Sequence, residues 1–233
     1  MENKTPVKEL EIYLIRHGQS NTNAGIAVHE IPTIQDMADP RLSELGISQA
    51  KKLGAYLSDI QFDAVYSSAL LRAERTATEV INCQKNRQKL RLLPLLTENG
   101  MGKDYEGASW EEIHEINPDA ALAPDIDENS SLMCYSSKDD DYAHFLRAKE
   151  TIEYFRAHHK MGEKICVVSH AAFITHIVFY LMGLSEVPLF DINFSNTGVT
   201  RIIFYKHGTN QYGDTIFDYI NSTTHLEKDM ETK

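Results

Sequence analysis

Residues 11–18 read EIYLIRHG, and this stretch decides which fold the sequence predicts. Residues 11–15 (EIYLI) are mostly apolar and favour β structure, which is typical of a short buried strand. The predicted strand runs directly into Arg16, His17 and Gly18, so charged and polar groups stand at its carboxyl end. In open α/β sheets, ligands bind outside the carboxyl ends of the strands. Similar groups at the ends of neighbouring strands would therefore complete a binding site.

Strands and helices alternate along the rest of the chain. The hydrophobic pattern predicts further strands at 62–66, 90–96, 165–168, 199–205 and 215–220. It predicts helices at 70–81, 110–116, 142–159 and 172–182, and another that opens near 42–46 with Ser43 as its N-cap. This alternation predicts an α/β fold, a three-layer sandwich with a mainly parallel central sheet flanked by helices. Residues 18–40 are predicted to be irregular, and the polar end after Leu226 a frayed tail.

The length and the composition bound the class of protein. A chain of 233 residues can bury a sizeable core, and we expect a single domain over residues 1–233. A variable insertion that caps the site is predicted at about 108–141, where residues 124–141 are rich in Asp, Glu and Ser. With 23 Lys and Arg against 34 Asp and Glu, the net charge of −11 opposes binding to nucleic acid or to anionic membranes.

Residues 165–184 (ICVVSHAAFITHIVFYLMGL) contain no Asp, Glu, Lys or Arg and are long enough to span a bilayer. Ser169, His170 and His176 interrupt the stretch, so we interpret it as a buried strand, a turn and a buried helix. Three cysteines without C-x-x-C spacing, and a charged segment at residues 1–11 without an apolar run, predict a cytoplasmic protein. If the chain forms an oligomer, a dimer is the expected form.

Chemically active side chains follow each predicted parallel strand. They are Arg16 and His17 after the first strand, Ser67, Ser68 and Arg72 after the second, Glu98 after the third, and Ser169 and His170 after the fourth. If these ends are neighbours, two arginines, two histidines and one glutamate meet in one crevice. Arginine forks bind phosphoryl oxygens, a neutral imidazole can accept a phosphoryl group, and a carboxylic acid can protonate a leaving oxygen. The set therefore suits a phosphate, and without a P-loop motif it does not predict a cradle for a nucleoside triphosphate.

Several ordered segments resemble one known family. The stretch 14–20 (LIRHGQS), together with Asn23, looks like the R-H-G signature of the histidine phosphatase superfamily, in its phosphoglycerate mutase-like branch. Similar segments follow at 39–46 (DPRLSELG), 66–73 (YSSALLRA), 96–98 (LTE), 167–170 (VVSH), 196–199 (NTGV) and 225–226 (HL). The R-H-G motif alone is weak evidence, but the segments together cover most of the chain, roughly residues 13–226.

The resemblance implies a role for five residues. His17 would be the nucleophile that forms a phosphohistidine, and Glu98 would be the proton donor. Arg16, Arg72 and His170 would hold the phosphoryl oxygens and stabilise charge in the transition state.

The resemblance also implies the surroundings of the phosphate and the kind of partner. Asn23 and Gln19 would help to hold phosphate or substrate, and Ala171 would lie beside them at a position where glycine is usual. The family needs neither a metal nor a cofactor. The expected partner is a small phosphorylated substrate, with no nucleic acid and no membrane.

Alternatives stay open at two points. Glu106 is the nearest rival of Glu98 for the role of the acid. The mutases of the family carry an Arg-His-Tyr-Gly run beside their acid, whereas residues 99–102 read NGMG here, which favours a phosphatase over a mutase. A catalytically idle phosphate-binding protein is the third hypothesis. The run of three aspartates at 139–141 is interpreted as a helix start, because its spacing does not fit a calcium loop.

Overall fold

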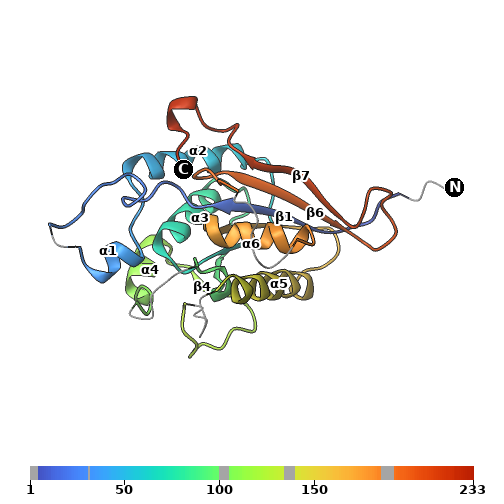
Figure 1. The fold of residues 1–233 in the computed structure, drawn as a ribbon, viewed down its shortest axis with the longest axis horizontal. Helices are drawn as coiled ribbons and strands as arrows, with labels where there is room; N and C mark the ends of the chain where they lie inside the picture. The colour runs from blue at the N-terminus through green and yellow to red at the C-terminus, as the bar shows by residue number, and fades with distance from the viewer. Residues whose placement is uncertain (1–4, 31, 100–104, 134–139, 185–191) are drawn as a thin grey trace.

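The protein folds around a seven-stranded sheet in a computed structural model that describes residues 5–30, 32–99, 105–133, 140–184 and 192–233 (Figure 1). Its strands are β1 (Lys8–Arg16), β2 (Ala64–Ser67), β3 (Leu90–Leu92), β4 (Ala121–Leu122), β5 (Glu163–Ser169), β6 (Val199–Tyr205) and β7 (Thr215–Ser222). Its α-helices are α1 (Ile34–Ala38), α2 (Glu44–Tyr56), α3 (Leu71–Cys83), α4 (Trp110–Ile116), α5 (Asp141–His158) and α6 (Ala171–Leu181). Two short 3-10 helices are η1 (Pro94–Leu96) and η2 (Lys228–Met230).

The strand order places the carboxyl ends of the early strands side by side. The order is β4-β3-β2-β5-β1-β6-β7, in which the first five strands are parallel and β6 pairs antiparallel with both β1 and β7. Within this register Arg16 lies opposite Ser169, and Ser67 lies opposite Val168. The predicted α/β class with a mainly parallel sheet is confirmed, and the expected neighbourhood of the strand ends follows from the order.

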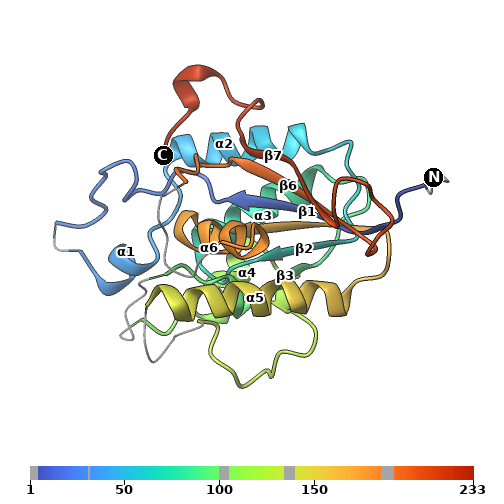
Figure 2. The same cartoon turned by 45° about the vertical axis from the view of Figure 1, so that its right-hand side comes forward.

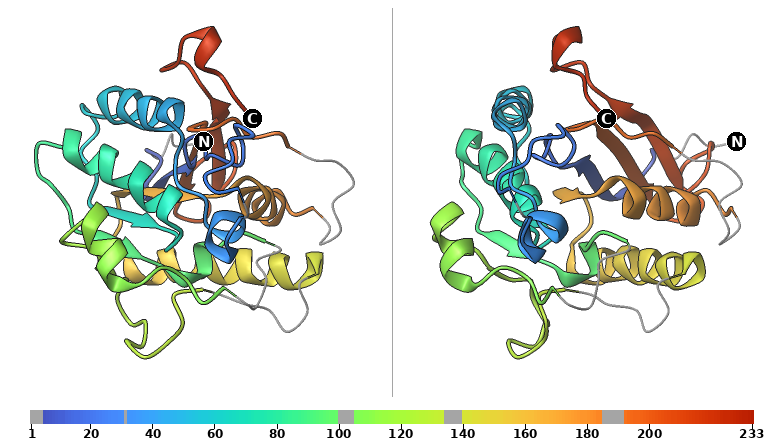
Figure 3. Two further views of the ribbon diagram at one scale, coloured as in Figure 1. Left: turned by 90° about the vertical axis from the view of Figure 1, so that its left-hand side faces the viewer. Right: turned by 60° about the vertical axis from the view of Figure 1, so that its left-hand side comes forward.

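Helices cover both faces of the sheet, as Figures 2 and 3 show for α2, α3 and α4 on one side and α5 and α6 on the other. Successive residues of a strand point to opposite faces, and β1 is buried on both. Ile12 and Leu14 pack in one core with residues of α5 and α6, whereas Tyr13 and Ile15 pack in the other with residues of α2 and α3. This burial on both faces explains why residues 11–15 read as a nearly continuous apolar run.

Capping residues explain where the helices begin. Ser43 caps α2 as predicted, because its hydroxyl accepts from the backbone N–H of Gly46 at 3.0 Å. α4 begins with a capping box between Ser109 and Glu112 and covers the predicted residues. The prediction of an irregular chain up to residue 40 was wrong for α1. This five-residue helix begins with a capping box at Thr33. Five residues are too few for a hydrophobic period to be visible.

The apolar stretch at 165–184 forms β5 and α6, with His170 as the N-cap residue between them. This is the predicted division into strand, turn and helix. No helix in the described part of the chain is both long and apolar enough to cross a membrane.

One further expectation needs correction, and a second agrees with the structure where its residues are described. The strand predicted at 90–96 ends at Leu92 and is followed by η1, because Pro94 has no N–H to continue a ladder. The aspartate run at 139–141 lies partly outside the described residues. Within them Asp140 is the N-cap of α5 and accepts from the backbone N–H of Ala143 at 2.9 Å, which agrees with the predicted helix start.

The end of the chain is held in place, and the prediction of a frayed tail was wrong. Thr232 donates its hydroxyl to Oδ1 of Asn196 at 2.9 Å, and its carbonyl accepts from the backbone N–H of Asn196 at 2.9 Å. Gln49 on α2 donates from Nε2 to the carbonyl of Met230 at 2.7 Å and to the hydroxyl of Thr232 at 2.8 Å. Polar residues that look solvated in the sequence thus satisfy two amide side chains on other elements.

Candidate active site

The structure brings four of the predicted site residues together at the carboxyl edge of the sheet. Arg16 ends β1 and His17 follows it, His170 follows β5, and Arg72 lies in the first turn of α3 after β2. The rings of His17 and His170 have centroids 5.1 Å apart, and Nε of Arg72 lies 3.3 Å from Nε2 of His17. All four residues are buried, with exposed fractions between 0% and 7%. The sheet therefore gathers two guanidinium groups and two imidazoles into one small volume.

Hydrogen bonds define the protonation of the His17 ring. Nδ1 lies 2.7 Å from the carbonyl oxygen of Gly18, which can only accept, so Nδ1 carries the proton. Nε2 is then the unprotonated nitrogen, and it accepts from Nε of Arg72 at 3.3 Å. The backbone N–H of His17 donates to the carbonyl of Ser169 at 3.0 Å and holds the residue against β5. The ring thus presents a lone pair on Nε2 next to a positive charge.

The turn after His17 packs main chain against main chain. The N–H of Gly18 donates to the hydroxyl of Thr76 on α3 at 3.0 Å. A Cβ atom on Gly18 would lie 2.6 Å from the carbonyl oxygen of Gly46, and a Cβ atom on Gly46 would lie 1.9 Å from the carbonyl oxygen of Gln19. Neither position has room for a side chain, so the loop of His17 and the start of α2 can meet only through glycines.

The two arginines are oriented by contacts with other segments. Nη1 of Arg16 donates to the carbonyl of Phe194 at 2.6 Å. Nη1 of Arg72 donates to Oδ1 of Asp39 at 3.3 Å and to the carbonyl of Ala38 at 3.2 Å. Both guanidinium groups are therefore held in place while other N–H groups remain for an anion.

Burial and charge decide the protonation of the site. Burial, followed by the charges of Arg72 and Arg16, holds the pKa of His17 well below its ordinary value. The pKa of His170 is also well below its ordinary value, because of burial and then the charge of Arg72. Burial also lowers the pKa of Arg16 and of Arg72, and the opposing charge of Glu98 raises both. Both imidazoles are thus neutral beside two cations at neutral pH.

Glu98 lies within electrostatic range of this cluster on a different segment. Its half-buried carboxylate accepts from the backbone N–H of Phe173 in the first turn of α6 at 3.1 Å and from that of Asn99 at 2.8 Å. The first turn of a helix favours a negative charge. Glu106, the rival for the acid, is exposed.

The remaining predicted residues lie on the segments next to the cluster. Oδ1 of Asn23 accepts from the hydroxyl of Ser20 at 3.0 Å and closes an exposed turn. Gln19 is buried with its Oε1 accepting from the hydroxyl of Ser43 at 2.7 Å, at the start of α2. Ala171 is the first residue of α6 and follows His170 directly.

The composition of the cluster defines its chemistry. Two permanently charged forks and two neutral imidazoles match the oxygens of a phosphoryl dianion. Neither ring nitrogen of His170, nor Nε of Arg16, has a hydrogen-bond partner in the described residues although all three atoms are buried. Buried polar atoms are normally satisfied, so these atoms point to an anionic ligand. Among the described residues no three His, Cys, Asp or Glu side chains gather as a metal site.

A family model agrees with this geometry. The model of the histidine phosphatase superfamily (branch 1) matches residues 12–213. The chain belongs to this superfamily. The match includes every residue of the cluster, so the resemblance that the sequence motifs indicated is confirmed.

Relatives within the superfamily carry out more than one reaction. The chain is 28% identical over 202 residues to a 2,3-bisphosphoglycerate-dependent phosphoglycerate mutase of Rhizobium meliloti (strain 1021), covering 82% of this chain and 88% of that protein. It is 28% identical over 188 residues to the adenosylcobalamin/alpha-ribazole phosphatase of Escherichia coli (strain K12), covering 75% and 80%. The crystal structure of an Entamoeba histolytica phosphoserine phosphatase with 3-phosphoglyceric acid has a TM-score of 0.62 at 24% identity, covering 94% of this chain and 100% of that chain, and shows the shared fold.

Sequence reasoning missed a buried aspartate behind the superfamily's second arginine. Asp39 is 1% exposed, and its carboxylate accepts from Nη1 of Arg72 at 3.3 Å, the N–H of Leu71 at 3.0 Å and the hydroxyl of Tyr105 at 3.1 Å. Burial raises the pKa of Asp39, and the charge of Arg72 opposes this. The segment DPRLSELG was identified as part of the resemblance, but nothing in its letters showed that its first residue would contact α3.

Two other contributors were also missed. Nδ2 of Asn196 donates to the carbonyl of His17 at 3.1 Å and lies 3.4 Å from Oδ1 of Asn23, so it links His17 to the turn at residues 20–25. Arg147 on α5 is buried beside the segment of Glu98, whereas the sequence predicted only a helix at 142–159 and no role for this residue. In both cases the partner lies far away in the chain.

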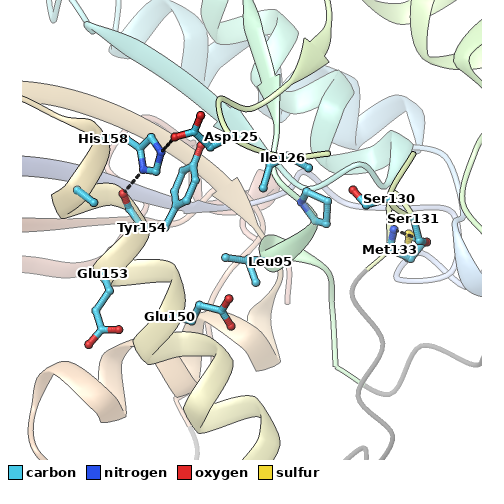
Figure 4. A pocket seen from close by; sticks show the side chains of 12 residues that line it. Leu95, Asp125, Ile126, Ser130, Ser131, Met133, Glu150, Glu153, Tyr154 and His158 are labelled. Carbon is cyan, nitrogen blue, oxygen red and sulfur yellow. Dashed lines mark hydrogen bonds and ion pairs between the residues drawn. The ribbon is translucent and has the colours of Figure 1, made fainter. Parts of the chain in front are cut away.

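A separate groove of about 670 Å³ lies on the outer side of α5 (Figure 4). Side chains of η1, of α5 and of residues 125–133 line it, and none of the strand-end residues does. Tyr154 donates to the carbonyl of Pro124 at 2.7 Å, and Nε2 of His158 contacts Oδ2 of Asp125 at 3.0 Å. These bonds attach residues 124–125 to α5, so the groove is bounded by a segment of the predicted insertion.

Proposed function

We propose that the protein is a phosphatase that hydrolyses a small phosphomonoester through a covalent phosphohistidine at His17. The observation that carries the proposal is the protonation state of the His17 ring. Its proton is held on Nδ1 by the carbonyl of Gly18, and burial beside Arg72 and Arg16 keeps the ring neutral. A neutral imidazole with an unprotonated Nε2 is a nucleophile at physiological pH, once Arg72 turns its N–H groups to the phosphoryl oxygens.

In the first step Nε2 of His17 attacks the phosphorus atom. The N–P bond forms while the bond from phosphorus to the ester oxygen breaks, and Glu98 donates its proton to that oxygen, which leaves as an alcohol. Arg16 and Arg72 bind the equatorial oxygens, on which charge is spread in the transition state. His170 donates an N–H to the same oxygens, a role that its unpartnered buried nitrogens support.

In the second step water resolves the phosphohistidine. The carboxylate of Glu98 accepts a proton from a water molecule, whose oxygen attacks phosphorus as the N–P bond breaks. Inorganic phosphate leaves and His17 regains its neutral ring. Each step is completed by groups of the protein, so the proposed cycle requires no metal and no cofactor.

Hydrolysis is favoured over mutase chemistry by the residue after Glu98. The mutases have a basic run beside their acid, whereas this chain has Asn99, followed by residues that lie outside the described ones. Oδ1 of Asn99 accepts from Arg147 at 2.7 Å and its Nδ2 faces Nδ1 of His176 at 3.2 Å. The side chain is thus engaged with α5 and α6 and offers no cation to a second anionic group. A mutase remains the second candidate, because relatives such as the Rhizobium meliloti protein carry that name.

The region at about 108–141 is proposed to cap the site and to select the substrate. Tyr105 and Met133 pack with Leu70, two residues before Arg72. This contact supports the proposal, because it joins Met133 of the region, and Tyr105 just before the region, to the start of the helix that carries the arginine.

The test measures phosphate release from p-nitrophenyl phosphate without added metal. We expect His17→Ala to lose activity about 10³-fold or more, since nothing else can form the covalent intermediate. A wild-type rate equal to that of His17→Ala would leave only an idle phosphate-binding protein.

Two further measurements complete the test. Interconversion of 2- and 3-phosphoglycerate faster than their hydrolysis would identify a mutase. Glu98→Gln should slow phenyl phosphate far more than p-nitrophenyl phosphate, because only the poorer leaving group needs a proton. If Glu106→Gln shows this pattern and Glu98→Gln does not, the assignment of the acid is wrong.

A further inference from the structure

A buried arginine from α5 holds the segment that carries Glu98. Arg147 is 8% exposed, and its guanidinium donates from Nη1 to the carbonyl of Leu95 at 3.1 Å and to the carbonyl of Thr97 at 2.5 Å. Nη2 donates to Oδ1 of Asn99 at 2.7 Å. These acceptors lie on both sides of Glu98, so one side chain fixes the chain before and after the acid.

The same guanidinium also contacts the residue that binds the carboxylate. Cζ of Arg147 lies 3.9 Å from the centroid of the Phe173 ring, in the geometry of a cation–π contact. The backbone N–H of Phe173 donates to Oε1 of Glu98 at 3.1 Å. The contacts thus connect Arg147 to Phe173 and Phe173 to Glu98. Phe173 lies in the first turn of α6, whose N-cap residue is His170.

The geometry requires an arginine rather than any cation. Three acceptors are reached from two nitrogens of one planar fork, while its face stacks on an aromatic ring. A lysine has a single ammonium group on a flexible stem and cannot make these contacts together. The segment itself has little structure of its own, since η1 ends at Leu96. Its conformation after that point depends on bonds from other elements.

We infer that Arg147 is the positioning residue of the proton donor, which sets the carboxyl of Glu98 at the distance from the leaving oxygen that proton transfer requires. The inference rests on the proposed role of Glu98 as general acid. A general acid acts only within hydrogen-bond reach of its target, and a displacement of about 1 Å can cost on the order of 10²-fold in rate. Loss of Arg147 should therefore reduce acid catalysis and leave the binding of the phosphoryl group intact.

The experiment compares kcat/KM of Arg147→Lys for phenyl phosphate and for p-nitrophenyl phosphate. We expect a loss about tenfold larger for phenyl phosphate, whose leaving group needs the proton. Arg156→Lys, on the same helix but half-exposed and paired with Glu9 at 2.7 Å, is the matched control and should leave both rates unchanged. Equal losses for both substrates would overturn the inference, because a merely structural arginine affects all leaving groups alike.

The double variant Arg147→Lys with Glu98→Gln gives the second readout. If Arg147 acts through Glu98, the double variant should show no more leaving-group dependence than Glu98→Gln alone. Multiplying effects would overturn the inference. If Glu98→Gln itself shows no leaving-group dependence, the proposed function fails in its choice of acid, which is a different result.

A milder variant covers the case that Arg147→Lys does not fold. Asn99→Ala removes the acceptor that follows Glu98 in the chain and leaves the charge of Arg147 in place. We expect a loss of a few-fold for phenyl phosphate and a smaller one for p-nitrophenyl phosphate. If Asn99→Ala lowers the rates for phenyl phosphate and p-nitrophenyl phosphate by the same factor, or lowers neither, the inference is contradicted.

Discussion

The two sides of the site are built in different ways. The phosphate side, defined here as Arg16, His17, Arg72 and His170, stands at the ends of β1, β2 and β5, where sheet register alone sets Arg16 opposite Ser169. The acid side consists of Glu98 on an irregular segment held by residues 50 and 75 positions away in the chain. Sheet pairing thus brings the strand ends of the phosphate side together, and side-chain contacts orient its two arginines. The segment of Glu98, the proposed acid, is instead placed by contacts from α5 and α6.

The largest expected effect tests whether the phosphate side serves every substrate alike. Arg72→Ala should lower kcat/KM about 10³-fold for phenyl phosphate and for p-nitrophenyl phosphate, because the lost charge stabilises the phosphoryl oxygens in both reactions. Arg75→Ala is the control on the same helix, since Arg75 is half-exposed and its guanidinium bonds to Glu79 at 2.7 Å and 3.1 Å, on the outside of the helix rather than at the strand ends. A loss that grows as the leaving group becomes poorer would remove the distinction between the two sides.

A smaller effect concerns the stability of α3, the helix that carries Arg72. Both carboxyl oxygens of Glu74 are buried and lack a hydrogen-bond partner in the described residues, and burial followed by the charge of Asp39 raises the pKa of Glu74 to about 9. Between the ordinary value of 4.5 and this pKa the folded protein holds a proton that the unfolded chain has lost. The free energy of unfolding should therefore fall with rising pH, by about 1.4 kcal/mol per pH unit from this group.

Glu74→Gln should remove this slope. Chemical denaturation at about pH 5.5 and about pH 7.5 should show that the variant gains about 2 to 3 kcal/mol relative to the unmodified protein over that interval. Glu79→Gln, on the same helix and paired with Arg75, is the control. A slope unchanged by Glu74→Gln would mean that the carboxyl is ionised in the folded state.

The smallest expected effect is that the imidazole rings of His17 and His170 do not titrate near neutral pH. Burial keeps the pKa of His17 and of His170 well below the ordinary value of 6.5, so neither ring should gain a proton between about pH 8 and about pH 6. The exposed His207, whose pKa is raised by its bond to Asp214, should titrate above that ordinary value and serves as the internal control. Imidazole NMR shifts check this, and a midpoint near 6.5 for either buried ring would contradict it.

The same shift has a consequence for stability. Below pH 6.5 the unfolded chain binds protons at these two histidines and the folded protein does not. Unfolding then takes up protons, so the free energy of unfolding should decrease as the pH falls below that value.

The contrast between the two sides also explains what could be predicted from the sequence. Alternation of strands and helices and the groups at strand ends depend on local periods of two and 3.6 residues, so Arg16, His17, Arg72 and His170 could be brought together before any coordinates. Asp39 and Arg147 could not, because their partners lie on other elements and a buried charge looks like a solvated one in the sequence. On α5 the buried face includes Arg147, which a hydrophobic pattern excludes by definition.

The contact between Gly18 and Gly46 limits which substitutions the protein can accept in evolution. Where the loop of His17 meets α2 at these two glycines, an added side chain would collide with main-chain atoms, which cannot turn aside as a flexible side chain can. A side chain on Gly18 would displace the backbone of Gly46, and one on Gly46 would displace the backbone of Gln19, so a substitution at either position shifts the loop that holds His17. Sequence divergence among descendants of this chain is therefore expected to accumulate away from the two glycines.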